Sequence, residues 1–384
     1  MKGGWEIKKL GDVASYINGF AFKPEHWNDE GMPIIRIQNL NNPDALYNYC
    51  NIDIPSKYIV ESGDILISWS ASLGVYEWKG ENAYLNQHIF KVVFDKIPIN
   101  KLFLKYAVGA KINEMLKDAH GATMKHVVKK DFDNTKIIYP PLPEQERIVA
   151  ELDCLSSVIE KQKELLKELD NLAQSTFYTM FGDPISNEKG WEVKKLGDCF
   201  YHIKNGANIK QERGAGGIPI TRIETLSGGI FNRDRLGYAN LQEVSKYQQY
   251  VLNTGDLLLS HINSKVYIGR TVAYHKEGNE VIIHGMNLLR LIPNADTILP
   301  IYMQYFSYTD MFKGQVANRR KDAVNQSSIS VADLKTVSIP IPPISYQQEF
   351  ASKIEMIEKQ KELIKQSIAE TETLFNSRMD YYFN

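Results

Sequence analysis

One block of this chain occurs twice, and that duplication constrains its fold more than any other feature. WEIKKLGD at residues 5–12 returns as WEVKKLGD at residues 191–198 with a single substitution. GDIL at 63–66 returns as GDLL at 255–258, and EKQKEL at 160–165 returns unchanged at 358–363. A period this long lies far outside the roughly 20–50 residues of solenoid repeats. The sequence therefore predicts a duplicated module with approximate internal two-fold symmetry.

Each copy reads as a globular domain followed by a long helix. Short apolar runs bounded by Gly, Asn and Asp are typical of strands and turns. A proline cluster ends each domain, at 140–143 and at 340–343, and proline both stops a strand and fits the first turn of a helix. Apolar residues then recur at steps of four and three, which predicts two helices that pair as a coiled coil.

The predicted seam of the helix pair contains these residues. The first helix contributes Ile148, Leu152, Leu155, Ile159, Gln162, Leu166, Leu169, Ala173 and Phe177, and the second Phe350, Ile354, Ile357, Gln360, Ile364, Ile368, Thr371 and Phe375. Gln162 and Gln360 are either a polar pair that sets the register or two exposed residues on the seam edge. The EKQKEL motif stands four residues farther from its proline cluster in the first copy, which predicts one extra turn there.

Charge and cysteine content limit the partners and the cellular compartment that the chain can have. The net charge is −1, but residues 143–181 hold 4 basic and 8 acidic side chains and residues 345–384 hold 5 and 7. The remainder therefore has a mild basic excess, which permits contact with phosphates without requiring it. Three scattered cysteines support neither a disulfide framework nor a zinc site. With no long apolar run and no signal segment, we expect a cytoplasmic protein.

Catalytic signatures are absent from the sequence. It contains no phosphate loop, dinucleotide fingerprint, H-E-x-x-H, G-x-S-x-G or Asn-Pro-Pro-aromatic motif. Asp183 followed by Glu192-x-Lys194 superficially resembles a nuclease core, but Glu6-x-Lys8 repeats the triplet without an upstream acid. We therefore expect both triplets to belong to structural entry strands, and the spacing of the eight histidines predicts no metal site.

Loops rich in Arg, Lys, Asn, Gln, Ser and His are the candidate contact sites if the domains bind a polymer. Such side chains can hydrogen-bond to base edges in the major groove of DNA. In the first copy the candidates are Arg36, Gln38, Asn39, Ser68, Trp69, Ser70, Gln87, His88, Lys125 and His126. In the second copy they are Arg222, Thr225, His261, Asn263, Ser264, Lys265, Asn287, Arg319, Arg320, Lys321, Asn325 and Gln326.

Structural alternatives exist for several of these candidates. Arg36 and Arg222 could form salt bridges within their domains, Trp69 could be a packing residue, and 319–321 could be a solvated charge run. The functional interpretation gains weight because these loops fall at equivalent places in both copies while their sequences differ. The framework repeats and the loops diverge.

Taken together, these motifs give the chain a family resemblance. Over its entire length it resembles the specificity subunit of type I restriction-modification systems. The resemblance rests on W-E-[IV]-K-K-L-G-D, G-D-[IL]-L-[IL]-S, the P-P-L-P-E-Q-E-R-I-V exit and the junction FGDP at 181–184. The second exit, PPISYQQE at 342–349, replaces Pro-Glu by Ser-Tyr, which leaves the start of the second helix open.

The resemblance implies an α+β fold: two similar mixed α/β target-recognition domains separated by two long antiparallel coiled-coil helices, as a pseudo-two-fold tandem repeat. The predicted segments are domain 1 at 1–140, a helix at 141–182, domain 2 at 183–341 and a helix at 342–384. Each domain is expected to read half of a bipartite DNA target, and the helical pair to set the spacer.

The resemblance also implies a chain without chemistry of its own. It would bind double-stranded DNA, two adenine-methylating modification subunits and restriction subunits, and no membrane. This chain would hold no cofactor and no metal, because S-adenosylmethionine, ATP and Mg²⁺ would bind the partners. Two alternatives remain: a duplicated protein-binding scaffold, and a fused restriction enzyme.

The hypothesis of two half-site readers and a helical spacer predicts the effect of two changes to the chain. Removing the four extra residues near 154–158 is expected to shorten or abolish the recognised spacer. Exchanging residues 36–39 is expected to alter one half-site only.

Overall fold

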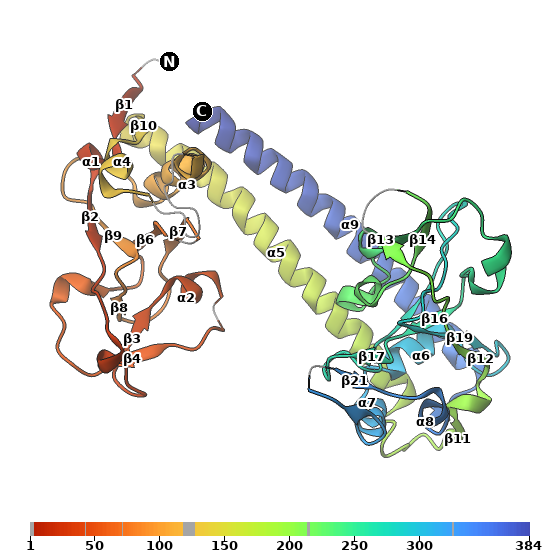
Figure 1. Ribbon diagram of the computed structural model, residues 1–384. Helices are drawn as coiled ribbons and strands as arrows, with labels where there is room; N and C mark the ends of the chain where they lie inside the picture. The colour runs from red at the N-terminus through yellow and green to blue at the C-terminus, as the bar shows by residue number, and fades with distance from the viewer. Residues whose placement is uncertain (1–3, 43, 71, 118–126, 213–215, 325) are drawn as a thin grey trace. The chain divides into compact units, whose positions relative to one another are not determined.

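The computed structural model describes residues 4–384 apart from 43, 71, 118–126, 213–215 and 325 (Figure 1). It divides into two compact units, Met1–Lys163 with Lys365–Asn384, and Glu164–Ile364. The division falls inside both long helices. Each unit therefore holds one copy of the duplicated domain together with part of each helix, whereas the sequence treated the helices as separate segments.

The described part of unit 1 combines short sheets with helices. The strand orders are β1-β10, β2-β9-β6-β7 and β4-β3-β8-β5, and among the described pairs β3 and β8 run parallel. The strands are β1 (Glu6–Lys9), β2 (Ser15–Asn18), β3 (Met32–Ile35), β4 (Asn48–Cys50), β5 (Ile59–Val60), β6 (Ile65–Ser68), β7 (Gly74–Glu77), β8 (Ala83–Leu85), β9 (Ile89–Val93) and β10 (Lys136–Tyr139). The helices are α1 (Leu10–Val13), η1 (Pro24–His26), α2 (Ile37–Asn41), η2 (Ser56–Tyr58), α3 (Lys101–Lys117), α4 (Lys129–Asn134) and the first part of α5 (Leu142–Phe181).

Unit 2 repeats this plan with one additional small sheet. Its strand orders are β11-β22, β12-β19-β16-β18, β13-β15-β14 and β17-β21-β20. The strands are β11 (Glu192–Lys195), β12 (Phe200–Asn205), β13 (Gln211–Glu212), β14 (Ile218–Ile220), β15 (Gly237–Ala239), β16 (Leu257–Leu259), β17 (Ile262–Asn263), β18 (Thr271–Ala273), β19 (Leu289–Pro293), β20 (Lys321–Asp322), β21 (Ser327–Ser328) and β22 (Ser338–Ile341). The helices are η3 (Leu196–Asp198), η4 (Ile223–Gly229), η5 (Arg233–Arg235), η6 (Ser245–Tyr250), α6 (Pro300–Phe306), α7 (Asp310–Ala317), α8 (Val331–Lys335) and the first part of α9 (Ile344–Phe383).

The duplicated W-E-[IV]-K-K motif forms an entry strand in both units, as the sequence predicts. β1 pairs antiparallel with β10, and β11 pairs antiparallel with β22, the strand that leads into the proline cluster. Each Glu-x-Lys triplet pairs internally, Lys8 with Glu6 at 2.7 Å and Lys194 with Glu192 at 3.4 Å. Among the described residues no group of three His, Cys, Asp or Glu side chains could hold a metal ion. The triplets therefore have a structural explanation.

The duplicated Gly-Asp motif builds the same turn in both domains. Asp64 forms an ion pair with Lys91 at 2.8 Å, and Asp256 forms the equivalent pair with Arg290 at 2.7 Å. The glycine before each Asp has a positive φ, 88° and 92°, which a side chain would disfavour. The second pair is the more deeply buried, and that burial raises the pKa of Asp256. The motif is therefore a turn closed by a charge pair.

The two long helices have equal lengths. Both α5 and α9 span 40 residues, and each begins directly after a Pro-Pro pair, 140–141 and 342–343. The Ser-Tyr replacement in the second exit therefore does not move the helix start. The EKQKEL motif lies one turn farther from the helix start in α5 than in α9, as the sequence predicts, although the two helices have the same overall length.

A buried glutamine connects the start of each helix to the domain before it. Gln145 accepts a hydrogen bond from the backbone N–H of Asn100 at 2.9 Å and donates to the carbonyl of Pro140 at 2.8 Å. Gln347 repeats both contacts, accepting from Leu299 at 2.8 Å and donating to the second proline cluster at 2.9 Å. Both side chains are fully buried. They satisfy backbone groups that would otherwise be left without partners inside the protein.

The helix segments within each unit run antiparallel. In unit 1 Gln162 donates to the Ser367 hydroxyl at 2.7 Å, and Lys163 pairs with Glu372 at 2.8 Å. In unit 2 Lys361 pairs with Asp170 at 2.7 Å. The predicted seam is buried or half-buried except at the exposed Gln360, whose place is taken by Lys361. The two glutamines are therefore not a polar pair.

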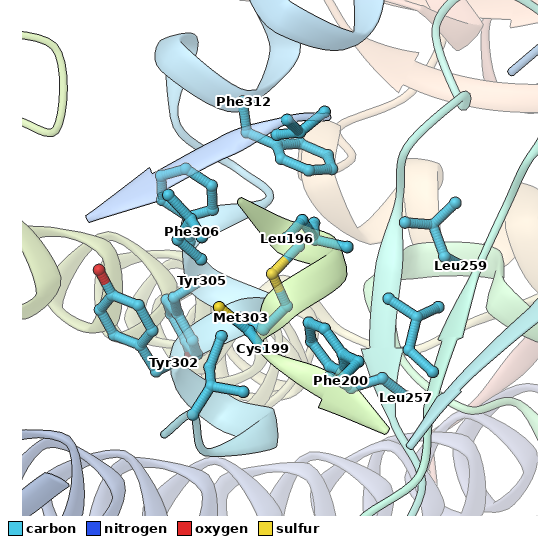
Figure 2. Close-up of a cluster of buried hydrophobic side chains, with 14 of the residues drawn as sticks. Leu196, Cys199, Phe200, Leu257, Leu259, Tyr302, Met303, Tyr305, Phe306 and Phe312 are labelled. Atoms are coloured by element: carbon cyan, nitrogen blue, oxygen red, sulfur yellow. The ribbon is translucent and has the colours of Figure 1, made fainter. Parts of the chain in front are cut away.

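Each domain core incorporates the ends of both helices. In unit 1 Ile148 and Leu152 of α5 join Tyr382 and Phe383 of α9 in one cluster. Unit 2 mirrors this with Phe177 and the other C-terminal apolar residues of α5 and with Phe350 of α9. Figure 2 shows the centre of this second cluster. Its labelled residues are Leu196, Cys199, Phe200, Leu257, Leu259, Tyr302, Met303, Tyr305, Phe306 and Phe312. The mixed α+β fold is confirmed.

None of the described helices is both long enough and apolar enough to cross a bilayer.

Candidate nucleic-acid interface

The parallel pairing of β3 and β8 creates a hollow in domain 1. Because the carboxyl ends of parallel neighbours meet at one edge, the residues after β3 and after β8 lie together there. Four predicted contact residues gather in this way, and they line a hollow of about 290 Å³. They are Arg36, Gln38, Gln87 and His88, joined by Phe22, Trp27, Ile37, Asn86 and Ile89.

Neutral groups hold Arg36 in this hollow. Its guanidinium donates to the Asn48 side-chain carbonyl at 2.9 Å and lies 5.5 Å from the centroid of the Trp27 ring. In the described part of the chain no carboxylate forms an ion pair with it, so its charge is not neutralised within the domain. A planar guanidinium fixed in this way has N–H groups left to donate to an external acceptor.

Trp69 packs against His88, one of the residues that line this hollow. Its indole N–H donates to Asn18 at 3.0 Å, and its ring stacks on Phe90 with centroids 5.7 Å apart. The ring of His88 packs against it at 5.3 Å. The structure thus gives Trp69 the packing role that the sequence left open, whereas the side-chain amide of Gln87 contacts His88 at 3.3 Å within the hollow.

Domain 2 places its equivalent arginine in different surroundings. Arg222 follows β14, as Arg36 follows β3, but it pairs with Glu224 at 3.4 Å. Glu224 occupies the position of Gln38 in the repeat, so a carboxylate has replaced a neutral amide. The Arg222 salt bridge that the sequence left open is therefore present, and its charge is offset inside the domain.

A longer hairpin distinguishes domain 2. β16 and β18 are joined through residues 260–270, and within this connection β17 pairs with β21 to form the additional sheet. In domain 1 the equivalent strands β6 and β7 are joined by a much shorter loop. The strand registers make Arg270 the counterpart of Gly74. The extra residues of this hairpin add polar and basic side chains to a surface that domain 1 lacks.

Arg270 connects two hollows on that surface. One, of about 330 Å³, is lined by Arg270 together with the predicted contact residue Asn263 and with Tyr267. The other, of about 640 Å³, is lined by Arg270 together with the predicted Lys265 and Arg320. Sequence reasoning missed Arg270 and Tyr267. Comparing the two hairpin lengths would have exposed them, since the insertion is where the copies differ most.

Five predicted contact residues are buried in the framework of their loops. They are Asn39, Ser68, Ser70, Thr225 and His261. Asn39 accepts from the backbone N–H of Arg36 at 3.1 Å, and Thr225 accepts from that of Arg222 at 2.9 Å. Ser68 donates to the carbonyl of Ser72. In this conformation these side chains fix the loops and do not face outward.

The remaining predicted residues fall into three groups. Arg319 is engaged locally, donating to Thr336 at 2.9 Å and to the Gln315 carbonyl at 3.0 Å. Ser264, Lys321 and Gln326 are exposed, and Asn287 is half-buried. Lys125, His126 and Asn325 lie outside the described residues.

Two buried histidines are specific to domain 2. Burial lowers the pKa of His261 to about 4 and that of His284 to about 4. His284 also contacts the Leu288 carbonyl through Nε2 at 2.8 Å. The equivalent positions of domain 1 are Trp69 and Leu85, which do not titrate. Both histidines are therefore neutral framework residues at neutral pH.

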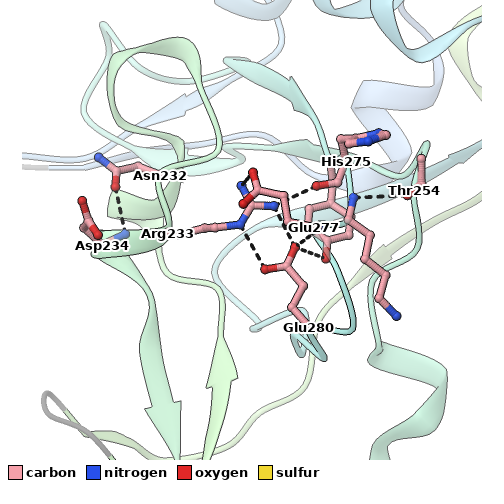
Figure 3. Close-up of polar contacts among 9 residues, drawn as sticks. Asn232, Arg233, Asp234, Thr254, His275, Glu277 and Glu280 are labelled. Atoms are coloured by element: carbon pink, nitrogen blue, oxygen red, sulfur yellow. Dashed lines mark hydrogen bonds and ion pairs between the residues drawn. The ribbon is translucent and has the colours of Figure 1, made fainter. Parts of the chain in front are cut away.

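A charge network joins Arg233 to the loop that follows β18 (Figure 3). Arg233 pairs with Glu277 at 2.8 Å and with Glu280 at 2.7 Å, and it donates to the His275 carbonyl at 2.8 Å. The hydrogen bond from Arg233 lowers the pKa of Glu280 to about 2. Because these charges satisfy one another, the network has a structural role.

Comparison with known proteins identifies the family. The model for the type I restriction modification DNA specificity domain matches residues 2–171 and 188–373. The chain therefore belongs to this family and contains its characteristic domain twice.

Individual relatives agree with the family match. A putative type I restriction enzyme MjaX specificity subunit from Methanocaldococcus jannaschii is 43% identical over 166 residues, which span 42% of this chain and 38% of that protein. The EcoBI specificity subunit from Escherichia coli is 21% identical over 92% of this chain and 79% of its own length. These names confirm the prediction of a specificity subunit, a non-catalytic class of component.

Solved structures extend the likeness to the fold. The S subunit of the type I system from M. genitalium aligns with a TM-score of 0.55 at 14% identity, covering 99% of this chain and 96% of that one. A chain from a study of the assembly and conformational transition of a type I R-M system aligns with a TM-score of 0.59 at 19% identity, covering 99% and 97%. At these identities the likeness concerns the fold alone.

Proposed function

We propose that this chain is the DNA-reading subunit of a type I restriction-modification complex, in which each domain recognises one half of a split target. The observation that carries the proposal is the pair of matching loop positions. Arg36 and Arg222 follow equivalent strands on the same framework, yet one faces a hollow among neutral groups and the other is tied to a carboxylate. Equivalent positions with unlike chemistry are what two independent readers require.

Arg36 is the strongest candidate for reading a base in domain 1. Arginine donates two hydrogen bonds to O6 and N7 of guanine, and this pairing needs a guanidinium held in a fixed plane. Asn48 and Trp27 supply that constraint. Gln38 and Gln87 line the same hollow and could add contacts to adenine.

We further propose that the paired helices set the gap between the half-sites. Both helices are 40 residues long, which at about 1.5 Å per residue corresponds to roughly 60 Å. Their antiparallel contacts, such as Gln162 with Ser367, would fix the length of the pair. Rigid paired helices suit a ruler better than a flexible linker would.

The partners of the complex would bind along these helices. Leu165 and Leu172 of α5 are 42% and 49% exposed, and Met356 and Leu363 of α9 are 59% and 65% exposed. Large exposed apolar side chains on a water-facing helix are typical of a protein interface. We propose that two adenine-methylating subunits dock there and that restriction subunits join them, which would place the working complex in the cytoplasm with the DNA.

On this proposal the cofactors belong to the partners. S-adenosylmethionine would bind the modification subunits, and ATP and Mg²⁺ the restriction subunits. Domain-to-partner contacts, rather than a bound small molecule, would then give this chain its role.

The direct test is to express the chain with the adenine methyltransferase that we expect to be encoded beside it and to map methylated adenines by single-molecule sequencing. We expect a split motif with a fixed gap. A complex that assembles but adds no methylation would contradict the proposal and favour a protein-binding scaffold.

The ruler is tested by shortening both helices together. Deleting 158–164 from α5 and the facing 367–373 from α9 removes seven residues from each, or about two turns, so the seam stays in phase. The pair becomes roughly 10 Å shorter at about 1.5 Å per residue, which is about three base pairs at about 3.4 Å per step. We expect the methylated motif to keep both half-sites and lose about three base pairs of gap. An unchanged gap in an assembled complex would refute the ruler.

A further inference from the structure

Unit 2 contains a strongly basic concavity. The 640 Å³ hollow is lined by Lys265, Arg270, Lys313 and Arg320, and Asp310 is the single carboxylate among the described residues of its lining. We propose that this basic hollow binds a backbone phosphate of double-stranded DNA and thereby fixes the register of domain 2 on its half-site. The inference rests on the proposed function, because it names the part of the DNA that this surface would hold.

Two of the four cations are pre-positioned by one acid outside the hollow. Asp322 pairs with Lys265 at 3.0 Å and with Arg320 at 3.0 Å. Hydrogen bonds from Ser327 and Lys265 hold the pKa of Asp322 at about 2, so it stays ionised. The pairing sets the direction of both cations but offsets only part of their charge.

The other two cations have no such partner. Within the described residues no ion pair joins Arg270 or Lys313 to a carboxylate. The guanidinium of Arg270 lies 4.6 Å from the centroid of the Tyr267 ring and donates to the Leu226 carbonyl at 3.5 Å. The ring fixes the guanidinium plane, and such a fixed fork matches the oxygens of a phosphate group.

Domain 1 has no arginine at the equivalent position. The strand registers place Gly74 there. The basic hollow is thus tied to the longer hairpin of domain 2. Since phosphate contacts position a protein on DNA without reading its sequence, we expect Arg270 to govern affinity rather than specificity.

The experiment uses the full chain assembled with its methyltransferase and a duplex that carries the mapped motif. Binding constants are measured across a salt series for the wild type, Arg270→Gln and Lys313→Gln. Each variant is expected to lower the slope of log K against log salt by roughly 1 and to weaken cognate and scrambled duplexes by a similar factor. Lys276→Gln, an exposed cation of the same unit outside the hollow, is the matched control and should leave the slope unchanged.

Neutral methylphosphonates introduced one at a time into the duplex locate the contact. We expect the wild type to lose affinity at one or two positions of the domain 2 half-site, and Arg270→Gln to be insensitive at those positions. An unchanged salt slope, or a changed base in the methylated motif, overturns the phosphate assignment while leaving the reading function intact. Competition by inorganic phosphate without any methylphosphonate effect would assign the hollow to a small anion instead. A wild-type complex that binds DNA without sequence preference removes the proposed function, and the inference with it.

Discussion

The two domains share a framework but differ in the chemistry of their loops. Both have the entry strand, the Gly-Asp turn with its ion pair, and the buried glutamine at the helix start. Domain 1 surrounds Arg36 with neutral groups, whereas domain 2 neutralises Arg222 and instead places Arg270 on a longer hairpin. The two copies therefore keep the contacts that fix the backbone and differ in the side chains on their surfaces.

The largest expected difference between the domains concerns the repeated ion pair. Arg290→Gln leaves Asp256 buried without its counter-charge, which typically costs about 3–5 kcal/mol. Lys91→Gln breaks the equivalent pair in domain 1, whose side chains are 19% exposed compared with 9% and 4% in domain 2. We expect the smaller loss there, because water can solvate the remaining carboxylate. Hydrogen exchange followed domain by domain measures both, and equal losses would contradict the ranking.

Acid should weaken domain 2 before domain 1. The folded pKa values of His261 and His284 are lowered to about 4 by burial, from 6.5. Between these values the unfolded state binds more protons, so stability is fully present above pH 6.5 and falls as the pH drops towards 4. At about 1.4 kcal/mol per pKa unit, the loss is up to roughly 3 kcal/mol for each histidine.

Hydrogen exchange at pH 7 and pH 5 detects this difference between the domains. His284→Leu introduces the residue that domain 1 has at this position and should roughly halve the pH dependence in domain 2, because His261 still titrates. A pH response of the same size in that variant would mean that other groups control acid stability.

The buried glutamines should contribute similarly to both domains, with Gln347 slightly ahead because it also donates to the Thr297 carbonyl at 3.0 Å. Gln145→Ala and Gln347→Ala each leave buried backbone groups without hydrogen-bond partners, at a cost of about 1–3 kcal/mol. Urea unfolding of the two variants compares them directly, with the exposed Gln366→Ala as control. A large inequality would show that the repeated contact has different importance in the two copies.

The smallest effect on stability is expected at Arg36 and Arg222, the arginines at equivalent positions of the two domains. Substitutions there should instead affect DNA recognition. Arg36→Gln should relax one base of the first half-site, a change worth about 1–3 kcal/mol of discrimination. Arg222→Gln should leave the motif unchanged, because Glu224 already occupies that guanidinium. Methylation mapping of both variants decides the matter, and a change in the second half-site caused by Arg36→Gln would contradict independent readers.

The sequence predicted the repeated features well because short-range chemistry dictates them. Proline clusters determined where the helices begin, and apolar spacing predicted the seam from Ile148 to Phe177. The same spacing placed Gln360 on the seam, but the structure leaves this side chain exposed. On α9 the half-buried Lys361 lies at the seam instead, where it forms an ion pair with Asp170 of α5. The spacing of residues along one helix does not predict such a contact with the other helix.

The candidate site was only partly predictable. Residue type marked Arg36 and Gln87 as contact candidates, which lie in one hollow because both follow parallel strands. It could not separate exposed side chains from those that hold their own loop, as Asn39 and Thr225 do. Arg270 escaped notice because an isolated arginine after a glycine has no motif, and its importance depends on Tyr267 and a hairpin whose length matters only in three dimensions.

The last turn of α9 affects the order in which the protein can be completed. Tyr382 and Phe383 are buried in the core of unit 1, and Tyr382 donates to Glu151 at 2.6 Å. Unit 1 begins at the first residues of the chain yet needs residues 365–384, which a ribosome makes after all of unit 2. During synthesis the core of the first domain therefore stays incomplete, with part of its apolar surface uncovered, until the second domain has been made.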